Sequence, residues 1–307
     1  MVTSPGQKLK ASIERKIKSI RKYVMRLYSE RSCLYFLLAV VLCSMCTKLP
    51  AQENYLPDGV LKVCQDPDNL PFSNARGEGF ENKIAELLAK KLGWKLAYTD
   101  FPQRMGFIRN TLKFKLPGEN FRCDLVMGLP ADYDQAATTA PYFRSSYVLV
   151  IADENQTAGV NSEAEFLTLP RSVRDVLKIG VFIRSPGVRW LMQNELIEQA
   201  IPYRSLDADP DHHPGDIIEH ELVSGKIDAA LVWGPVAAYY ASKVTTKKLK
   251  VITLQSYASL PLSYGIAMGV RHEDKAWKAK VEQLLQESRA EIRDILHQYQ
   301  VPFIEEP

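Results

Sequence analysis

The chain of 307 residues is 46% hydrophobic and 24% charged, and its formal net charge is +3. Ten Lys and Arg and two Glu residues lie in the first 51 positions, so the remaining chain carries 29 basic and 34 acidic residues and a charge of −5. This mildly acidic balance argues against nucleic acid as a partner, permits a basic protein partner, and leaves enough chain for one large domain or two lobes.

The amino terminus has the pattern of a secretion signal. Several Lys and Arg residues precede an uncharged stretch, Ser32 to Thr47, whose apolar centre LYFLLAVVLCSM is short for a membrane span. We therefore predict a leader over residues 1–51 and export to a bacterial periplasm. Leu49-Pro50-Ala51 matches the cleavage pattern poorly, and no lipoprotein box surrounds Cys43 or Cys46, so a leader retained as an anchor is the alternative.

The segment from Leu61 to Gly93 predicts a strand, a long loop and a helix. The strand covers Leu61 to Cys64, and an apolar stripe at helical spacing predicts a helix from Phe80 to Leu92 that Gly93 ends. Ligands of open parallel sheets bind at the carboxyl ends of strands, so the loop is a candidate site, whereas Phe80 is predicted to lie in the core. The candidate residues of the loop are Asp66, Asn69, Phe72, Ser73 and Glu78.

Strands and helices alternate through the rest of the chain. Predicted strands cover 95–98, 124–128, 146–152, 177–183, 201–203, 228–233, 250–254 and 263–270. Predicted helices cover 104–114, 187–199, 215–224 and 235–242, followed by one long amphipathic helix from Trp277 to Leu296. This alternation predicts an α/β protein with parallel sheets covered by helices, and its two series suggest two lobes. We expect lobe 1 over 58–150, lobe 2 over 151–250, and a return to lobe 1 over 251–307.

Two cysteines, Cys64 and Cys123, follow the leader. In an oxidising compartment an even pair suggests a disulfide. Against it, Cys64 ends one predicted strand and Cys123 begins another, and in parallel neighbouring strands their Cα atoms could exceed the roughly 7 Å that a disulfide spans. A disulfide and two free thiols therefore both remain open.

Four motifs resemble those of type II periplasmic solute-binding proteins, which are two-lobed α/β proteins with a mainly parallel sheet flanked by helices in each lobe. These motifs are Leu61–Cys64 before Pro71–Ser73, Cys123–Gly128, Thr139–Phe143 and Gly225–Ala230. More narrowly, five segments resemble the MxaJ/XoxJ family. They are Asp66–Asn74, Gly77–Ile84, Pro102–Arg104, Gly106–Leu112 and Val232–Pro235.

The narrower resemblance implies a function, because MxaJ/XoxJ proteins are the binding-protein-like partners of periplasmic quinoprotein methanol dehydrogenases. It implies a non-enzymatic chain without a cofactor of its own, which assists the maturation or activation of a methanol or alcohol dehydrogenase. Pyrroloquinoline quinone (PQQ) and Ca²⁺ or a lanthanide would belong to that dehydrogenase, and its cytochrome c is a further candidate partner. The first alternative is a receptor that hands a small non-amino-acid ligand to an ABC transporter.

The sequence departs from amino-acid-binding members where they hold the two charges of a zwitterion. In such members the segment after this strand resembles a Thr-x-Glu-Arg run, whose arginine binds the ligand carboxylate. This chain has Leu129 to Asp134 at that place. Where they place an acid for the ligand amine, this chain reads Val232 to Pro235. A small ligand should therefore make aromatic and apolar contacts, with Phe72, Tyr133, Tyr142 and Trp233 as candidate lining. The alternative is that Tyr142 and Trp233 fill the lobe cores.

Other polar residues are further candidates. Arg104 is a candidate in the segment after the second strand, although Arg104 and Arg109 need not share a helical face and both are expected to be solvated. Arg144 and Ser145 fall where the chain should cross between the lobes, so they either meet a ligand or form structural hydrogen bonds. The segment Asp207–His213 lacks calcium-loop and zinc spacing and is predicted to be a polar surface loop.

The sequence contains no G-x-S-x-G elbow, H-E-x-x-H motif, Walker loop or dinucleotide fingerprint. Asp66, Glu78 and Glu81 could supply paired carboxylates, so a cleft enzyme that uses Asp66 and Glu78 is the second alternative. A catalytic pair needs two separated pKa values, which the sequence does not reveal.

Overall fold

The computed structural model describes residues 55–57, 59–103, 106–204 and 213–304, together with 18–19 and 21–22. The chain divides into two compact units, Met1–Glu53 and Asn54–Pro307, and the second contains the fold. Most of the predicted leader, Arg104 and most of the Asp207–His213 segment lie outside the described residues. Within the described part of the chain, no helix is long and apolar enough to cross a membrane.

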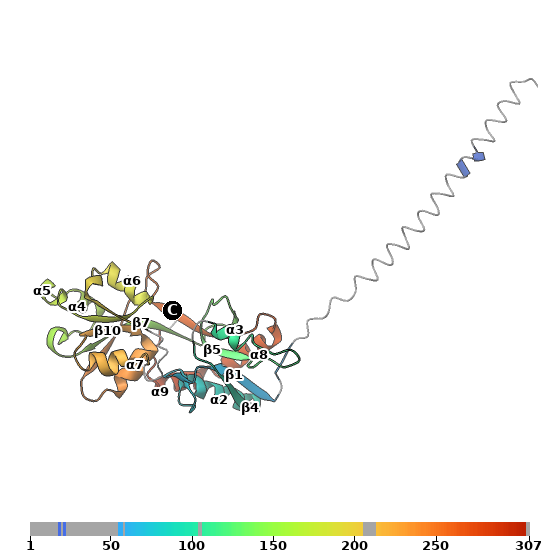
Figure 1. Ribbon diagram of the computed structural model, residues 1–307, viewed down its shortest axis with the longest axis horizontal. Helices are drawn as coiled ribbons and strands as arrows, with labels where there is room; N and C mark the ends of the chain where they lie inside the picture. Colours follow the sequence, from blue (N-terminus) through green and yellow to red (C-terminus); the bar gives the residue numbers. More distant parts are fainter. Residues whose placement is uncertain are drawn as a thin grey trace, which may run out of the picture. The chain divides into compact units, whose positions relative to one another are not determined.

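Twelve strands belong to the described part of the chain. They are β1 (Val60–Gln65), β2 (Asp68–Asn69), β3 (Ser73–Asn74), β4 (Lys95–Asp100), β5 (Leu125–Pro130), β6 (Ala137–Thr138), β7 (Phe143–Ala152), β8 (Ile179–Phe182), β9 (Ala200–Tyr203), β10 (Ala229–Trp233), β11 (Leu249–Thr253) and β12 (Ser263–Val270). Ten of them form one sheet in the order β4-β1-β5-β12-β7-β10-β8-β9, with β6 paired to β12 and β11 paired to β7 (Figure 1). The other two, β2 and β3, pair as a short hairpin in the loop after β1.

The strand β7 belongs to both lobes. Its first residues, 143–146, pair with β12, whereas residues 147–152 pair with β10 and β11. The pairings of β1 with β4 and β5, and of β8 with β9 and β10, are parallel, so each lobe has the parallel core that the alternating sequence predicts.

The helices of the described chain cover the faces of this sheet. They are α2 (Phe80–Leu92), α3 (Phe107–Asn110), α4 (Glu163–Leu167), α5 (Arg171–Arg174), α6 (Pro186–Gln193), α7 (Gly234–Lys243), α8 (Lys275–Glu287) and α9 (Arg289–Gln298), with 3₁₀ turns at Asn155–Thr157 and Ile197–Gln199 and a π-helical segment at Ile217–Leu222.

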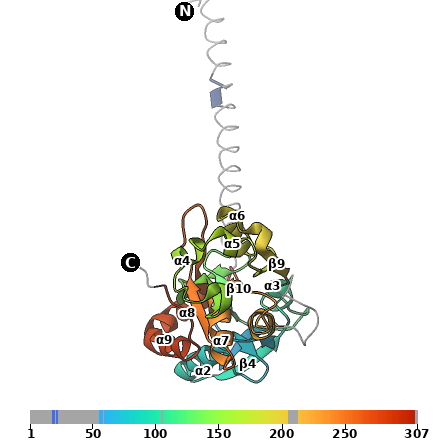
Figure 2. The same cartoon turned by 90° about the vertical axis from the view of Figure 1, so that its left-hand side faces the viewer.

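In lobe 1 the predicted stripe of α2 forms the core. Phe80, Ile84 and Leu88 are fully buried against Leu61 of β1, and Gly93 ends the helix in the left-handed conformation at φ 70°. The helix α9 lies beside α2 (Figure 2), and Lys91 of α2 pairs with Glu291 of α9 at 2.6 Å. The prediction that Phe80 is a core residue is confirmed.

In lobe 2 the two faces of the sheet carry separate cores. Alternate residues of β7 face opposite sides, because side chains along a strand alternate. Leu149 and Ile151 pack with Trp190 of α6, whereas Val148 and Val150 pack with residues that include Tyr240 of α7. The continuous apolar run of β7 is therefore covered by helices on both sides.

Cys64 and Cys123 form a disulfide with a Cα–Cα distance of 5.4 Å. The strands β1 and β5 are parallel neighbours, and the ladder places Cys64 opposite Val126. Cys123 precedes β5 and is free of that ladder, which is why the expected obstacle to a disulfide does not arise. Of the two open predictions, the disulfide is confirmed.

A buried ion network supports the same region. The fully buried Arg271 pairs with Asp124 at 2.9 Å and with Asp274 at 2.6 Å, and it donates to the Cys123 carbonyl at 2.7 Å. The Tyr55 hydroxyl also donates to Asp124, at 2.9 Å. These partners offset the large cost of burying a guanidinium group.

Several predicted elements differ in the structure. The helix expected over 104–114 is reduced to α3, which begins after Gly106 at φ 87° and ends where the Thr111 hydroxyl donates to the Phe107 carbonyl at 2.7 Å. The helix expected from Trp277 to Leu296 breaks at Ser288 into α8 and α9. The strand expected over 250–254 pairs with β7 beside lobe 2, so the predicted return to lobe 1 at residue 251 is too early.

Candidate functional site

The loop between β1 and α2 is held by its own polar residues. The carboxylate of Asp66 accepts the backbone N–H of Asp68 at 3.0 Å and that of Gln103 at 2.6 Å. The Ser73 hydroxyl donates to the Asp66 carbonyl at 2.7 Å. Asp66 and Ser73, which were predicted to bind a ligand or partner, therefore brace the loop and connect it to the segment before α3.

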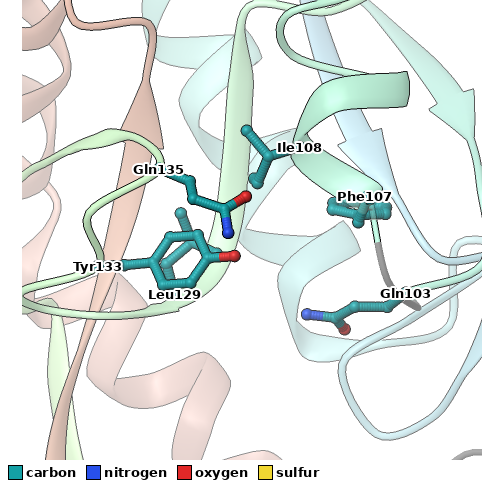
Figure 3. A pocket seen from close by; sticks show the side chains of 7 residues that line it. Gln103, Phe107, Ile108, Leu129, Tyr133 and Gln135 are labelled. Atoms are coloured by element: carbon teal, nitrogen blue, oxygen red, sulfur yellow. The ribbon is translucent and has the colours of Figure 1, made fainter.

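A cavity of about 440 Å³ lies between α3 and the segment that follows β5. Its lining residues are Gln103, Gly106, Phe107, Ile108, Leu129, Tyr133 and Gln135. In Figure 3 the Tyr133 hydroxyl and the Gln103 amide nitrogen point toward one another across the space, which the Gln135 side chain also lines. The structure thus places one predicted lining residue, Tyr133, in a cavity with side chains that were not predicted.

Gln103 and Gln135 are polar lining residues that the sequence did not predict, and Gln103 has the contacts that connect it to the site loop. The Asn69 side-chain amide donates to Gln103 Oε1 at 2.9 Å, and the Asp66 carboxylate holds the Gln103 backbone N–H. Two predicted site residues therefore reach the cavity through Gln103 and not directly. The Pro102–Arg104 motif contains this glutamine, but the charged arginine beside it is the stronger signal of a binding site.

The other predicted aromatic residues pack against the cores. Phe72 lies 5.2 Å from the ring of Phe80, and Trp233 lies 5.5 Å from the ring of Tyr147. Both Phe72 and Trp233 contact the core of lobe 1 and the core of lobe 2 that contains Tyr240. Both side chains are only partly buried where the lobes meet, so a lining role stays a prediction for Phe72, and for Trp233 both the lining role and the core-filling alternative stay open.

Tyr142 forms a hydrogen bond with the carboxyl group of Glu81. The side chain of Glu81, in the first turn of α2, lies over Gly128, where an added Cβ would meet Glu81 Oε1 at 2.5 Å. The Tyr142 hydroxyl donates to Glu81 Oε1 at 3.4 Å. Burial raises the pKa of Glu81 to about 8, so this carboxyl is mostly protonated at neutral pH.

An interlobe contact is made by three tyrosines, here termed the aromatic clasp: Tyr239 and Tyr240 of α7, and Tyr299 after α9. The Tyr240 hydroxyl donates to the Leu70 carbonyl at 3.1 Å, and the rings of Tyr239 and Tyr299 stack with centroids 6.1 Å apart. The Tyr299 hydroxyl donates to the Glu78 carbonyl at 2.5 Å. The clasp thus connects lobe 2 to the predicted site loop of lobe 1.

Glu78 and Arg144 have structural partners, whereas the buried Ser145 hydroxyl has no hydrogen-bond partner among the described residues. The half-exposed Glu78 accepts from Arg76 at 2.9 Å and from Asn74 at 2.7 Å, and these hydrogen bonds lower its pKa. Ser145 is fully buried against Gly234, where an added Cβ would meet its hydroxyl at 2.9 Å. The Arg144 carbonyl accepts the backbone N–H of Ile304 at 3.1 Å.

These contacts bear on the cleft-enzyme alternative, and the positions of the acidic, histidine and cysteine side chains bear on metal binding. Asp66 and Glu78 are each held by separate donors, so the pairing that a cleft enzyme would need finds no support in their contacts. Among the described residues, no group of three or more His, Cys, Asp or Glu side chains could hold a metal ion.

Two α/β lobes that share β7, with the chain returning to lobe 1 through β12, α8 and α9, define a type II periplasmic binding protein fold. No protein-family model matches the chain. The ancestral cationic amino acid solute-binding protein AncCDT-1 covers 78% of the chain at 20% identity with a TM-score of 0.58, a likeness that shows the fold alone.

More specific relatives identify the family. Protein MoxJ of Methylorubrum extorquens AM1 is 29% identical over 270 residues, which is 83% of this chain and 85% of MoxJ. The periplasmic binding protein XoxJ of Methylobacterium extorquens AM1 is 32% identical, with a TM-score of 0.63 over 80% of this chain and 100% of XoxJ. MxaJ of Methylophaga aminisulfidivorans MPT has a TM-score of 0.66 at 22% identity over 80% of this chain and 100% of MxaJ. The chain belongs to the MxaJ/XoxJ family, which confirms the resemblance seen in its motifs.

Proposed function

We propose that this protein is a periplasmic, non-catalytic accessory protein of a PQQ-dependent methanol or alcohol dehydrogenase and assists its maturation or activation. Its membership of the MxaJ/XoxJ family supports the partner, and the periplasmic binding protein XoxJ supports the compartment. PQQ and Ca²⁺ or a lanthanide would be held by the dehydrogenase, with its cytochrome c as a further partner.

The observation that carries the proposal is the way the lobes meet. In a transport receptor, a bound solute holds the two lobes together through its own contacts. Here the protein supplies those contacts itself through the aromatic clasp, through Trp233, and through Phe72, which contacts the cores of both lobes. Because the lobes contact each other directly, we infer that the loops at their junction are a docking surface for another protein. Loops on a rigid scaffold commonly carry binding residues.

Deletion of the gene tests this proposal directly. We expect lower alcohol dehydrogenase activity per dehydrogenase molecule in periplasmic extract, lower PQQ occupancy, or both, with recovery when the wild-type gene is restored. Co-purification of the dehydrogenase with a tagged copy of this protein is the second readout. A deletion strain whose dehydrogenase is fully active and fully loaded would remove the accessory role.

The variants for complementation should spare the cores. The sequence predicts Phe72 and Trp233 as binding residues, but replacing either with alanine removes packing from both lobes. The exposed Arg76, which pairs with Glu78 at 2.8 Å beside the clasp, offers a surface change through Arg76→Glu. Lys275→Glu, at the exposed start of α8, is the matched charge reversal away from the clasp.

The cavity beside Gln103 favours one alternative, a receptor that delivers a small non-amino-acid ligand to an ABC transporter. The two functions differ in their partners. A tagged protein that recovers a permease and its ATPase, with no dehydrogenase, would favour transport, as would permease and ATPase genes beside this one.

A further inference from the structure

The cavity beside Gln103 carries an inference that goes beyond the accessory role and does not depend on it. We propose that this cavity binds a small uncharged organic molecule that has a carbonyl or amide group at one end and an apolar ring or short chain at the other. The size of the cavity, the charge of its walls and the direction of its polar groups each point to this class.

The cavity volume of about 440 Å³ falls in the range of small-molecule sites. Water occupies about 30 Å³ per molecule in the liquid, so this volume is equivalent to roughly 15 water molecules. A molecule of roughly ten non-hydrogen atoms fits with room for accompanying water. A short organic ligand is within this size.

The described lining residues carry no charge. They are two glutamines, one tyrosine, one glycine and three apolar residues. An ion at such a site gains no countercharge from these side chains to offset the hydration that it gives up on contact. None of the described lining residues would pair with a carboxylate or an amine, in agreement with the missing zwitterion partners in the sequence.

The polar groups of the cavity favour a ligand that accepts hydrogen bonds. Gln103 Oε1 is occupied by Asn69 at 2.9 Å, and the Gln103 amide nitrogen points toward Tyr133 (Figure 3). The Gln103 side chain therefore presents its N–H groups to the space, and the Tyr133 hydroxyl can donate to the same acceptor. A carbonyl oxygen placed between them would accept both hydrogen bonds.

The apolar part of the ligand would lie against the remaining wall. The side chains of Phe107, Ile108 and Leu129 come from α3 and β5 and line the cavity together with the polar groups. Ile108 and Leu129 are themselves buried, so this wall is fixed by the core. The cavity therefore offers an apolar wall beside its polar groups, and small-molecule sites combine the two kinds of surface.

The polar end is arranged before a ligand arrives. Asp66 fixes the Gln103 backbone and Asn69 fixes its side chain, at 2.6 and 2.9 Å. Prior ordering lowers the entropy lost on binding, since the Gln103 side chain has already given up its rotamer freedom. Asp66 and Asn69 are positioning residues in this proposal, because they act through Gln103.

Matched probes of one shape and three charges test the proposal. Phenylacetamide is the neutral probe, and phenylacetate and 2-phenylacetamidine, whose amidinium group has the same planar shape, are its anionic and cationic counterparts. The protein is expressed from the complete reading frame, and binding is titrated by saturation-transfer NMR. We expect phenylacetamide to bind at least ten-fold more tightly than either ion.

Two variants and one control locate the binding. Gln103→Leu removes the proposed donor and should weaken phenylacetamide about five-fold or more, the effect of losing one hydrogen bond of about 1 kcal/mol. Tyr133→Phe should weaken it by a smaller factor. Gln283→Leu, a matched change on the exposed side of α8, should leave the affinity unchanged.

Three outcomes would overturn the proposal. They are the absence of detectable phenylacetamide binding at 10 mM, equal or tighter binding of phenylacetate, and an affinity for the amide that Gln103→Leu leaves unchanged in a variant with wild-type circular dichroism. A protein that binds the amide as proposed but has no effect on any dehydrogenase would support this inference and contradict the accessory role, so the two are separable.

Discussion

The buried carboxyl of Glu81 should make the protein less stable as the pH rises through the neutral range. Burial raises its pKa from 4.5 to about 8. Between these pH values the folded protein retains a proton that the unfolded chain has released, so the free energy of unfolding falls from about pH 4.5 to about pH 8 and then levels. Glu81→Gln removes this titration and keeps an oxygen that can accept from Tyr142.

The magnitude follows from the size of the pKa change. Each pH unit between the folded and unfolded pKa corresponds to 1.36 kcal/mol, so a rise from 4.5 to about 8 gives an upper limit of about 5 kcal/mol. Protein atoms crowd the Glu81 carboxyl, but the residue retains some exposed surface and solvent screens part of the effect. We expect the advantage of Glu81→Gln over wild type to grow by about 2–3 kcal/mol between pH 4.5 and pH 8.

Urea unfolding followed by circular dichroism at pH 4.5, 6, 7 and 8.5 measures this change. Glu86→Gln, at a half-exposed carboxylate of the same helix, is the control and should show no comparable trend. A difference between Glu81→Gln and wild type that is constant across this pH range would refute the reasoning, because it would mean that Glu81 titrates alike in the folded and unfolded chains.

Three further changes test the scaffold. Replacing both Cys64 and Cys123 with serine should lower the free energy of unfolding by about 4 kcal/mol, the chain-entropy value for a sequence separation of 59, and urea titration with wild-type stability would contradict it. Tyr239→Ala should loosen the clasp and increase the radius of gyration in small-angle scattering, whereas Tyr257→Ala, at a tyrosine 55% exposed, should not. Gly79→Ala would bring its Cβ to 2.0 Å from a loop carbonyl and should cost more than about 3 kcal/mol in unfolding free energy; a variant as stable as wild type would show that the loop yields easily.

The elements that the sequence predicts best are those with a strong local apolar pattern. The stripe of α2 has helical spacing and faces one core, whereas β7 and β10 are short continuous apolar runs that are buried on both faces of the sheet. The motifs also identify the two-lobed fold and the family, which the XoxJ comparison confirms. Both results rest on local sequence.

The errors arise where long-range contacts decide. A helical pattern continues past Ser288, but the fully buried serine marks a break between α8 and α9. The strand β11 has no local feature that assigns it to a lobe, and only its pairing with β7 does so. The spacing of Cys64 and Cys123 could not settle the disulfide, because it depends on where the chain enters β5.

The candidate site shows the same division between residue type and placement. Charged and aromatic residues most often mark binding sites, and on this basis the sequence predicts Asp66 and Tyr133, whereas Asn69 is predicted from its place in the loop between β1 and α2. Gln103 was passed over because a lone glutamine carries no such signal, and its role depends on contacts with residues 34 and 37 positions away.

The loss of charged partners and the composition of the cavity have one physical consequence. A site that binds a zwitterion needs an arginine and an acid fixed in place, and the cost of burying them is recovered only when the ligand arrives. This chain places Trp233 in lobe 2 and neutral amides in lobe 1, so both surfaces are stable without a ligand. Lobe contact and small-molecule binding are therefore separate properties: Tyr239→Ala should loosen the lobes without weakening phenylacetamide, and Gln103→Leu should weaken phenylacetamide without loosening the lobes. A change in both properties from either variant would show that the cavity and the clasp are coupled after all.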